Sequence, residues 1–169
     1  MDSWGDRALS ALKDEFSDLP DGGQLVRLVL RLVVAALLGG LIGYERKAAG
    51  KHVGPRTHML VAAGSALFVL IPQQAGMPLS DLSRVLQGLL AGIGFLGGGA
   101  ILKSPDQGRV QGMTSAAGIW MVAAIGVAVG LGRIASAIVA ALFAYLILSF
   151  LYRLERKMDV DNGNHPLRP

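Results

Sequence analysis

Three glycines in the middle of the chain have a spacing that could bind a nucleotide. Gly92, Gly94 and Gly97 follow the G-x-G-x-x-G pattern of dinucleotide-binding loops. Such a loop needs a strand before it, a helix after it, and an acidic residue about 20 positions later that holds the ribose. The stretch before Gly92 is instead apolar, and no acid occurs between Asp106 and Glu155. The pattern therefore does not predict a nucleotide site.

Catalytic and metal-binding patterns are equally scarce. His58 and Ser65 could share a helix face, but seven residues of helix give a rise of about 10 Å, too long for a nucleophile and its base. Between residues 25 and 150 the only acids are Glu45, Asp81 and Asp106, and the chain contains no cysteine. Because Mg²⁺ prefers carboxylates and water, a dedicated metal site is not expected. We expect no catalytic residue, no cofactor and no enzyme activity.

A cluster of polar residues lies where one apolar segment ends and the next begins. Glu45 and Arg46 end the first segment, and Arg56, Thr57 and His58 begin the second, after a connection of about a dozen residues. We expect these ends to be neighbours, with Glu45 pairing with Arg56 or His58. Two interpretations remain open: a structural ion-pair network, or a site for an anion or for a partner's carboxylate.

Other polar residues lie at the ends of later segments. Asp81, Arg84 and Gln87 are expected on one face at the outer end of the third segment, where Asp81 could cap the helix and pair with Arg84. Thr114 and Ser115 begin the fourth segment. Each of these residues needs a helix end to position it.

Long uncharged runs supply those helices. The chain is 52% hydrophobic and 17% charged, against about a quarter charged in soluble domains. Uncharged, apolar runs of about 18 residues or more predict membrane-spanning helices. We therefore predict an all-α, polytopic membrane bundle of about five transmembrane helices, which occupies residues 25–155. The predicted spans are 25–44, 57–72, 83–102, 113–130 and 133–152.

Loop charges predict the orientation of these spans. Residues 1–24 contain six acids and two bases, whereas residues 45–56 have a net charge of +3. Since Lys and Arg stay on the cytoplasmic side, we predict an outside N-terminus and an inside C-terminus, with residues 156–169 as a short cytoplasmic tail. The basic sequence pI of about 9.8 then reflects orientation, and the expected partner is the lipid bilayer, not nucleic acid. A short amphipathic helix on the outer surface is predicted from apolar residues at helical spacing, Leu9, Leu12, Phe16 and Leu19.

The orientation can be measured because the chain has no cysteine of its own. Single cysteines introduced at Ser3 and Ser104 would be exposed to an impermeant maleimide in intact cells. We expect labelling at Ser3 and protection at Ser104. Labelling at Ser104 with protection at Ser3 would show that the orientation is the opposite of the predicted one.

Glycines recur at the spacing that allows membrane helices to approach closely. Lipid offers no hydrophobic drive for helices to meet, so small residues determine where they pack. On this basis we predict a homo-oligomer, most simply a parallel dimer, held by glycine-bearing faces. For Gly97 to Gly99 two interpretations remain open: packing, or a break in the third helix beside a cavity. The G-x-x-x-G pairs are Gly39/Gly43, Gly88/Gly92, Gly94/Gly98 and Gly126/Gly130.

Together these residues resemble one family of bacterial membrane proteins, MgtC/SapB, over roughly residues 27–155. The resemblance rests on the stretches GGLIGYERKAAG, VGPRTHMLVAAGSALF, DLSRVLQGLLAGIGFLGGGAIL and VQGMTSAAGIWMVAAIGVAVGLG. The positions that fall on family motifs are Gly43, Glu45, Arg46, Arg56, Thr57, His58, Gly64, Ser65, Asp81, Arg84, Gln87, Gly92, Gly94, Phe95, Gly97, Thr114, Ala116, Ala117 and Trp120.

The resemblance implies a protein of the bacterial inner membrane that is associated with magnesium homeostasis and virulence. It implies a non-enzymatic regulator of membrane energetics that acts through another membrane protein, such as the proton-translocating ATP synthase. Many members carry a soluble C-terminal domain, whereas only about a dozen residues follow Arg156 here. A role that depends on such a domain is not expected of this sequence.

A transporter or channel for Mg²⁺ or another small solute, formed by an oligomer, is the alternative to a regulator. A transport path would place the outer polar residues Arg84 and Gln87 and the Gly94–Gly99 segment in one cavity with Glu45 and His58. A regulator would instead show a lipid-facing strip of small residues and no continuous polar path.

Overall fold

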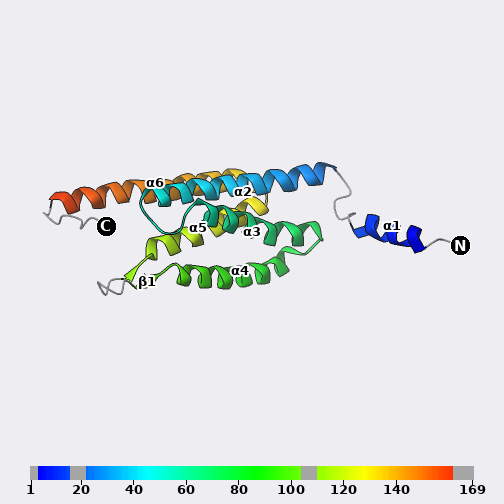
Figure 1. Ribbon diagram of the computed structural model, residues 1–169. Helices are drawn as coiled ribbons and strands as arrows, with labels where there is room; N and C mark the ends of the chain where they lie inside the picture. Colours follow the sequence, from blue (N-terminus) through cyan, green and yellow to red (C-terminus); the bar gives the residue numbers. More distant parts are fainter. Residues whose placement is uncertain (1–3, 16–21, 104–109, 162–169) are drawn as a thin grey trace. The chain divides into compact units, whose positions relative to one another are not determined.

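The structure is a computed structural model that describes residues 4–15, 22–103 and 110–161. Five helices of this described part are long and apolar enough to cross a membrane, which confirms the all-α bundle predicted from the sequence. Residues 1–30 and residues 31–169 form two separate compact units. The helices are α1 (Trp4–Glu15), α2 (Gly22–Ala48), α3 (Pro55–Gln74), α4 (Leu79–Gly99), α5 (Met113–Gly130) and α6 (Ile134–Asp161) (Figure 1).

Each predicted span falls on one helix, with small shifts at the ends. Helix α3 begins at Pro55, whose fixed backbone angle suits the first helical position. The third span was expected over 83–102, but α4 begins at Leu79, after Pro78 in extended conformation, and ends at Gly99. The chain then forms two short antiparallel strands, β1 (Leu102–Lys103) and β2 (Val110–Gln111).

The Gly97–Gly99 segment is helical and forms the last turn of α4. Its backbone therefore remains hydrogen-bonded, and the helix ends after the glycines instead of breaking at them. Gly92 and Gly94 lie within the same continuous helix, where no nucleotide-binding loop is formed. Helix α1 contains Leu9 and Leu12 of the expected amphipathic helix, while Phe16 and Leu19 lie outside the described residues.

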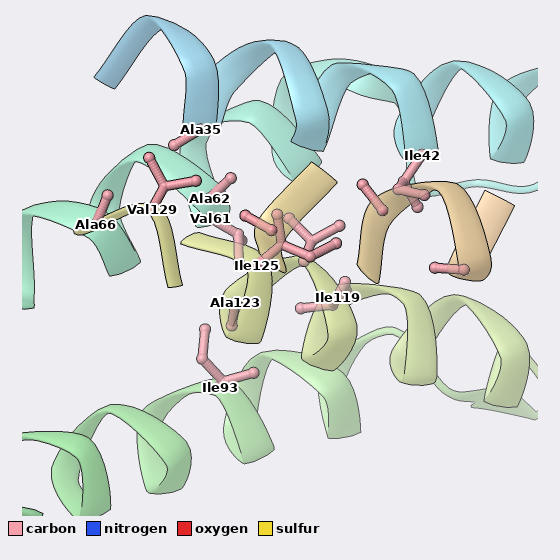
Figure 2. Packing of buried hydrophobic residues seen from close by; sticks show 14 residues of the cluster. Ala35, Ile42, Val61, Ala62, Ala66, Ile93, Ile119, Ala123, Ile125 and Val129 are labelled. Atoms are coloured by element: carbon pink, nitrogen blue, oxygen red, sulfur yellow. The ribbon is translucent and has the colours of Figure 1, made fainter. Parts of the chain in front are cut away.

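Helix α5 is the centre of the packing in residues 31–169, because α3, α4 and α6 all contact it. Its buried residues are small or β-branched, so neighbouring backbones come close. Figure 2 shows Ile93 of α4 pointing towards Ala123 on α5, and Ala62 of α3 and Ile125 of α5 belong to the same buried cluster. The core is therefore filled by apolar side chains contributed by several helices.

Two of the predicted glycine pairs pack inside this bundle. A Cβ at Gly39 would lie 2.5 Å from the carbonyl oxygen of His58, and one at Gly43 would lie 2.5 Å from the Cα of Pro55. A Cβ at Gly130 would lie 2.6 Å from the carbonyl oxygen of Ala66. Glycine is therefore required where α2 and α5 approach α3.

Arg31 closes the far end of α5. Its Nη1 donates a hydrogen bond of 2.9 Å to the carbonyl oxygen of Gly130, the last residue of the helix. A cation at a helix C-terminus also interacts favourably with the helix dipole. The next turn contains Gly132 with a φ of +78°, and a Cβ there would lie 2.7 Å from Arg31 Nη2.

Replacing this cap should weaken the bundle measurably. We expect Arg31→Met to lower the free energy of unfolding by about 1.5–3 kcal/mol, the range for a hydrogen bond made by a charged group. Thermal unfolding in detergent would measure the loss. The matched control is Arg27→Met, since Arg27 is exposed on the same helix, and an equal loss in both variants would contradict the capping role.

Candidate functional site

The end of the bundle where α2 stops and α3 starts, called here the α2–α3 end, contains a buried ion pair. Glu45 and Arg46 are only 7% and 2% exposed, and Arg46 Nη2 lies 2.5 Å from Glu45 Oε2. The same Nη2 donates a hydrogen bond of 3.3 Å to the carbonyl oxygen of Leu148 on α6. Buried charges of this kind are tolerated when they are paired and hydrogen-bonded. The pair therefore joins the end of α2 to α6.

This pairing differs from the one expected from the sequence. Glu45 was expected to reach Arg56 or His58, yet its ion-pair partner is its own neighbour, Arg46. The reason is burial: Glu45 and Arg46 are both enclosed, whereas Arg56 lies on the exposed side of the first turn of α3. A buried carboxylate binds most strongly to the cation that is buried with it. Arg56 is left exposed to the surroundings.

A cavity of about 250 Å³ opens beside Glu45, between α2 and α6. From α6 it is lined by Tyr145, Ser149 and Tyr152, three polar side chains that the sequence analysis did not single out. The signal was present, because positions i, i+4 and i+7 share a helix face. Lys51 Nζ lies 6.0 Å from the ring centroid of Tyr152, within cation–π range. The remaining lining residues are Tyr44, Ala48 and Ala49.

His58 is fully buried one turn into α3. Its Nδ1 lies 2.9 Å from the carbonyl oxygen of Gly54. Because a carbonyl only accepts, Nδ1 carries the proton, and Nε2 of the neutral ring is an acceptor. Within the described part of the chain Nε2 has no hydrogen-bond partner. It faces α5 at Gly118, where a Cβ would lie 3.5 Å away.

A second buried polar atom lies further along the same helix interface. Ser65 is 1% exposed, and its Oγ has no hydrogen-bond partner among the described residues. A Cβ on Gly126 of α5 would lie 2.9 Å from the Ser65 Cβ, so the two backbones are in close contact there. His58 and Ser65 therefore mark two polar points within an otherwise apolar α3–α5 contact.

The predicted polar cluster is thus divided by burial. Glu45, Arg46 and His58 are enclosed, while Arg56 and Thr57 are exposed at the start of α3. At the start of α5, Ser115 is 3% exposed, whereas Thr114 is exposed. Of the enclosed members, Arg46 bonds to a second helix, at Leu148 of α6, and the exposed members are available to a partner.

The second polar set, at the start of α4, lies elsewhere. Asp81, Arg84 and Gln87 are all exposed. Arg84 lines a cavity of about 440 Å³ between α3 and α4, together with Phe68 and other apolar residues. That cavity shares no lining residue with the one beside Glu45. The structure therefore does not join the two polar sets in one of these cavities.

The structure also shows what surrounds the glycines of α4 that the sequence analysis singled out. Gly88, Gly92, Gly94 and Gly98 have open space where a Cβ would lie, and a Cβ at Gly97 would make an ordinary contact of 3.7 Å with the Ala116 side chain. These glycines are therefore not required by packing within the described chain. Among the side chains that the structure describes, no group of three or more His, Asp or Glu is placed to hold a metal ion.

Comparisons with known proteins give one consistent result. The model of the MgtC family matches residues 32–157. The chain is 43% identical over 149 residues to "Protein SrpB" of Synechococcus elongatus, which covers 82% of this chain and 81% of that protein. No solved structure matches the chain.

Two further relatives are longer than the matched region. "Putative magnesium transporter YhiD" of Escherichia coli K12 is 35% identical over 79% of this chain and 65% of its own length. "Protein MgtC" of Brucella abortus is 40% identical over 76% of this chain. The matched region spans only about half, 52%, of that MgtC protein.

Proposed function

This chain belongs to the MgtC family of multi-pass membrane proteins, and we propose that it is a non-enzymatic regulator that works by contact with another membrane protein. The proposal links the chain to growth under magnesium limitation and to membrane energetics in the bacterial inner membrane. The proton-translocating ATP synthase is the partner we propose, on the family resemblance. The contact surface is the exposed part of the α2–α3 end, Arg56 and Thr57.

One observation carries this proposal: the polar residues at the two ends of the bundle belong to separate cavities. Glu45 lines the cavity between α2 and α6, whereas Arg84 lines the one between α3 and α4. Between the two ends, the contact of α3 with α5 is filled by small residues such as Ala62 and Ala66, both fully buried. A path for a hydrated ion needs polar groups along its length, so this arrangement favours contact with a partner over conduction.

The position of Arg56 supports a binding role. A cation at a helix N-terminus opposes the helix dipole, so its own helix does not stabilise it there. Burial of the neighbouring Glu45–Arg46 pair leaves the Arg56 guanidinium accessible to an anionic group. A carboxylate on a partner protein would supply a charge-assisted hydrogen bond.

Growth complementation tests this role. In a strain that fails to grow at low magnesium without its own family member, we expect the parent chain to restore growth. Arg56→Gln should not restore growth although its membrane abundance and melting temperature stay normal. Lys47→Gln is the matched control, because Lys47 is an exposed cation in the last turn of α2. Full rescue by Arg56→Gln would remove this surface from the proposal.

Transport is the second candidate, which the name of the Escherichia coli relative, "Putative magnesium transporter YhiD", suggests. In this alternative, an oligomer supplies the pathway, since the cavities within one chain are separate. Flux measured with purified protein separates the two candidates.

A further inference from the structure

Helix α4 has one face without a partner in the described part of the chain. Its buried residues, Leu82, Ile93 and Gly97, face the rest of the bundle. In the described part of the chain α3 and α5 are the helices that contact α4 closely, so no helix covers the opposite face. By helical spacing the exposed residues Asp81, Arg84, Gly88, Gly92 and Phe95 lie on that opposite face.

Two glycines lie in the middle of this face, although packing within the described chain does not require glycine there. A Cβ at Gly88 or Gly92 would meet nothing within 4 Å, in contrast to Gly39, where it would meet a backbone oxygen. Glycine within a helix costs about 1 kcal/mol relative to alanine. No packing within the bundle offsets that cost at these positions. Close packing of a second helix against the glycines would offset it.

The face also borders an apolar groove along α3. The cavity of about 440 Å³ that holds Arg84, Gly88 and Gly92 adjoins another of about 490 Å³. Both cavities are lined by Phe68 of α3 and Val85 of α4. The groove and the face together are large enough to receive side chains from a neighbouring helix.

The charges on this face are self-complementary. Asp81 and Arg84 lie three residues apart, both are exposed, and neither forms an ion pair in the part of the chain that the structure describes. When two copies pack in parallel about a twofold axis, each residue of the face meets the same face of the other copy. Asp81 of each copy then lies near Arg84 of the other. An antiparallel arrangement would instead place these charges at opposite ends.

Shape is complementary in the same register. Phe95 is 84% exposed and lies one turn after Gly92. In a parallel pair the two Phe95 rings lie at the same level, and Gly92 and Gly99, about one turn before and after Phe95, have open space in place of a side chain. A large ring against glycines is the kind of packing that holds membrane helices together without a hydrophobic drive.

We propose that two copies of this chain associate in parallel through α4, with Gly88 and Gly92 at the helix crossing and two reciprocal Asp81–Arg84 pairs at one end. The sequence left open whether Gly126 serves assembly or folding. In the structure Gly126 lies inside the bundle against Ser65, so it is not part of this interface. The proposal does not depend on the growth phenotype or on the partner of Arg56.

Disulfide trapping in membranes tests the contact directly, because the native chain has no cysteine. Ala91 is exposed beside the proposed face, whereas its neighbour Leu90 lies at the same depth and points away from it. We expect oxidation to link Ala91→Cys into dimers at least about tenfold more than Leu90→Cys, because a disulfide needs Cα atoms within about 7 Å. Equal or reversed yields would overturn the interface.

Charge reversal tests the reciprocal pairs in the Ala91→Cys background. Asp81→Arg alone and Arg84→Asp alone should each reduce the dimer yield several-fold, since each places like charges together. The double variant should restore it, because the pairs re-form with exchanged signs. Unchanged yields in both single variants, failure of the double variant to recover, or a disulfide-independent complex with a different protein in place of the dimer would each contradict the proposal.

Discussion

Glu45→Gln should destabilise the protein by about 3–5 kcal/mol, the range for removing one partner of a buried ion pair. The substitution leaves the Arg46 guanidinium, 2% exposed, without its carboxylate. The hydrogen bond from Arg46 to Leu148 is neutral at its acceptor and does not replace the lost charge. Thermal unfolding of the purified variant in detergent, together with its abundance in membranes, measures this loss.

The control for this experiment removes a charge from the same end of the bundle but leaves no buried charge without its partner. Arg56→Gln changes an exposed side chain, so its free energy of unfolding should stay within about 0.5 kcal/mol of the parent. The double variant Glu45→Gln, Arg46→Gln removes both charges and should recover part of the loss. A Glu45→Gln protein as stable as the parent would show that the pair is not structural.

Gly126→Leu should prevent the bundle from forming. Even a Cβ at this position would contact the carbonyl oxygen of Ala62 and would lie 2.9 Å from the Cβ of Ser65, so α5 and α3 would have to separate. Overpacking of a core typically costs about 1–3 kcal/mol and more where backbone must move. We therefore expect little folded protein in the membrane.

The matched variant is Gly92→Leu, where a Cβ meets nothing within 4 Å. Its yield and melting temperature as a monomer in detergent should equal or exceed those of the parent, because leucine removes the helix cost of glycine, whereas its dimer yield should fall. Folding of Gly126→Leu to parental yield would contradict the described contact between α3 and α5. The two glycines thus distinguish packing within a chain from packing between chains.

The spans were predictable because charge is nearly absent between the helix ends. Membrane helices exclude Asp, Glu, Lys and Arg from their middle, so the few charges between Thr57 and Tyr152 mark where helices stop. The exact ends depend on local chemistry, such as Pro78 before α4 and the strand pairing of Leu102 after it. Those features extend or shorten a span by a few residues.

The roles of individual glycines were not predictable in the same way. A G-x-x-x-G pair shows that a helix has a face for close approach, but it does not name the neighbour. A Cβ at Gly39 or Gly126 would meet the backbone of α3. Gly88 and Gly92 form a pair with the same G-x-x-x-G spacing, yet a Cβ at either would meet nothing in the described chain. Only the arrangement of α2 to α6 separates these two cases.

The residue types in the sequence indicated the candidate site, but they did not indicate which cation pairs with Glu45. Neighbouring residues on a helix point about 100° apart, so an ion pair between Glu45 and Arg46 was less expected than one with Arg56. Burial of both side chains, with Arg46 bonded to Leu148 of α6, decides the outcome. Contacts with a helix that lies about 100 residues away in sequence cannot be inferred from local spacing.

We propose that this protein works by contact and does not conduct ions, and ion flux in proteoliposomes distinguishes the two. Purified parent protein would be reconstituted, and the influx of Mg²⁺ and of protons would be measured beside protein-free vesicles. We expect influx equal to that of the protein-free vesicles, from a preparation of the same chain that restores growth at low magnesium. Protein-dependent influx of either ion, proportional to the amount reconstituted, would contradict it.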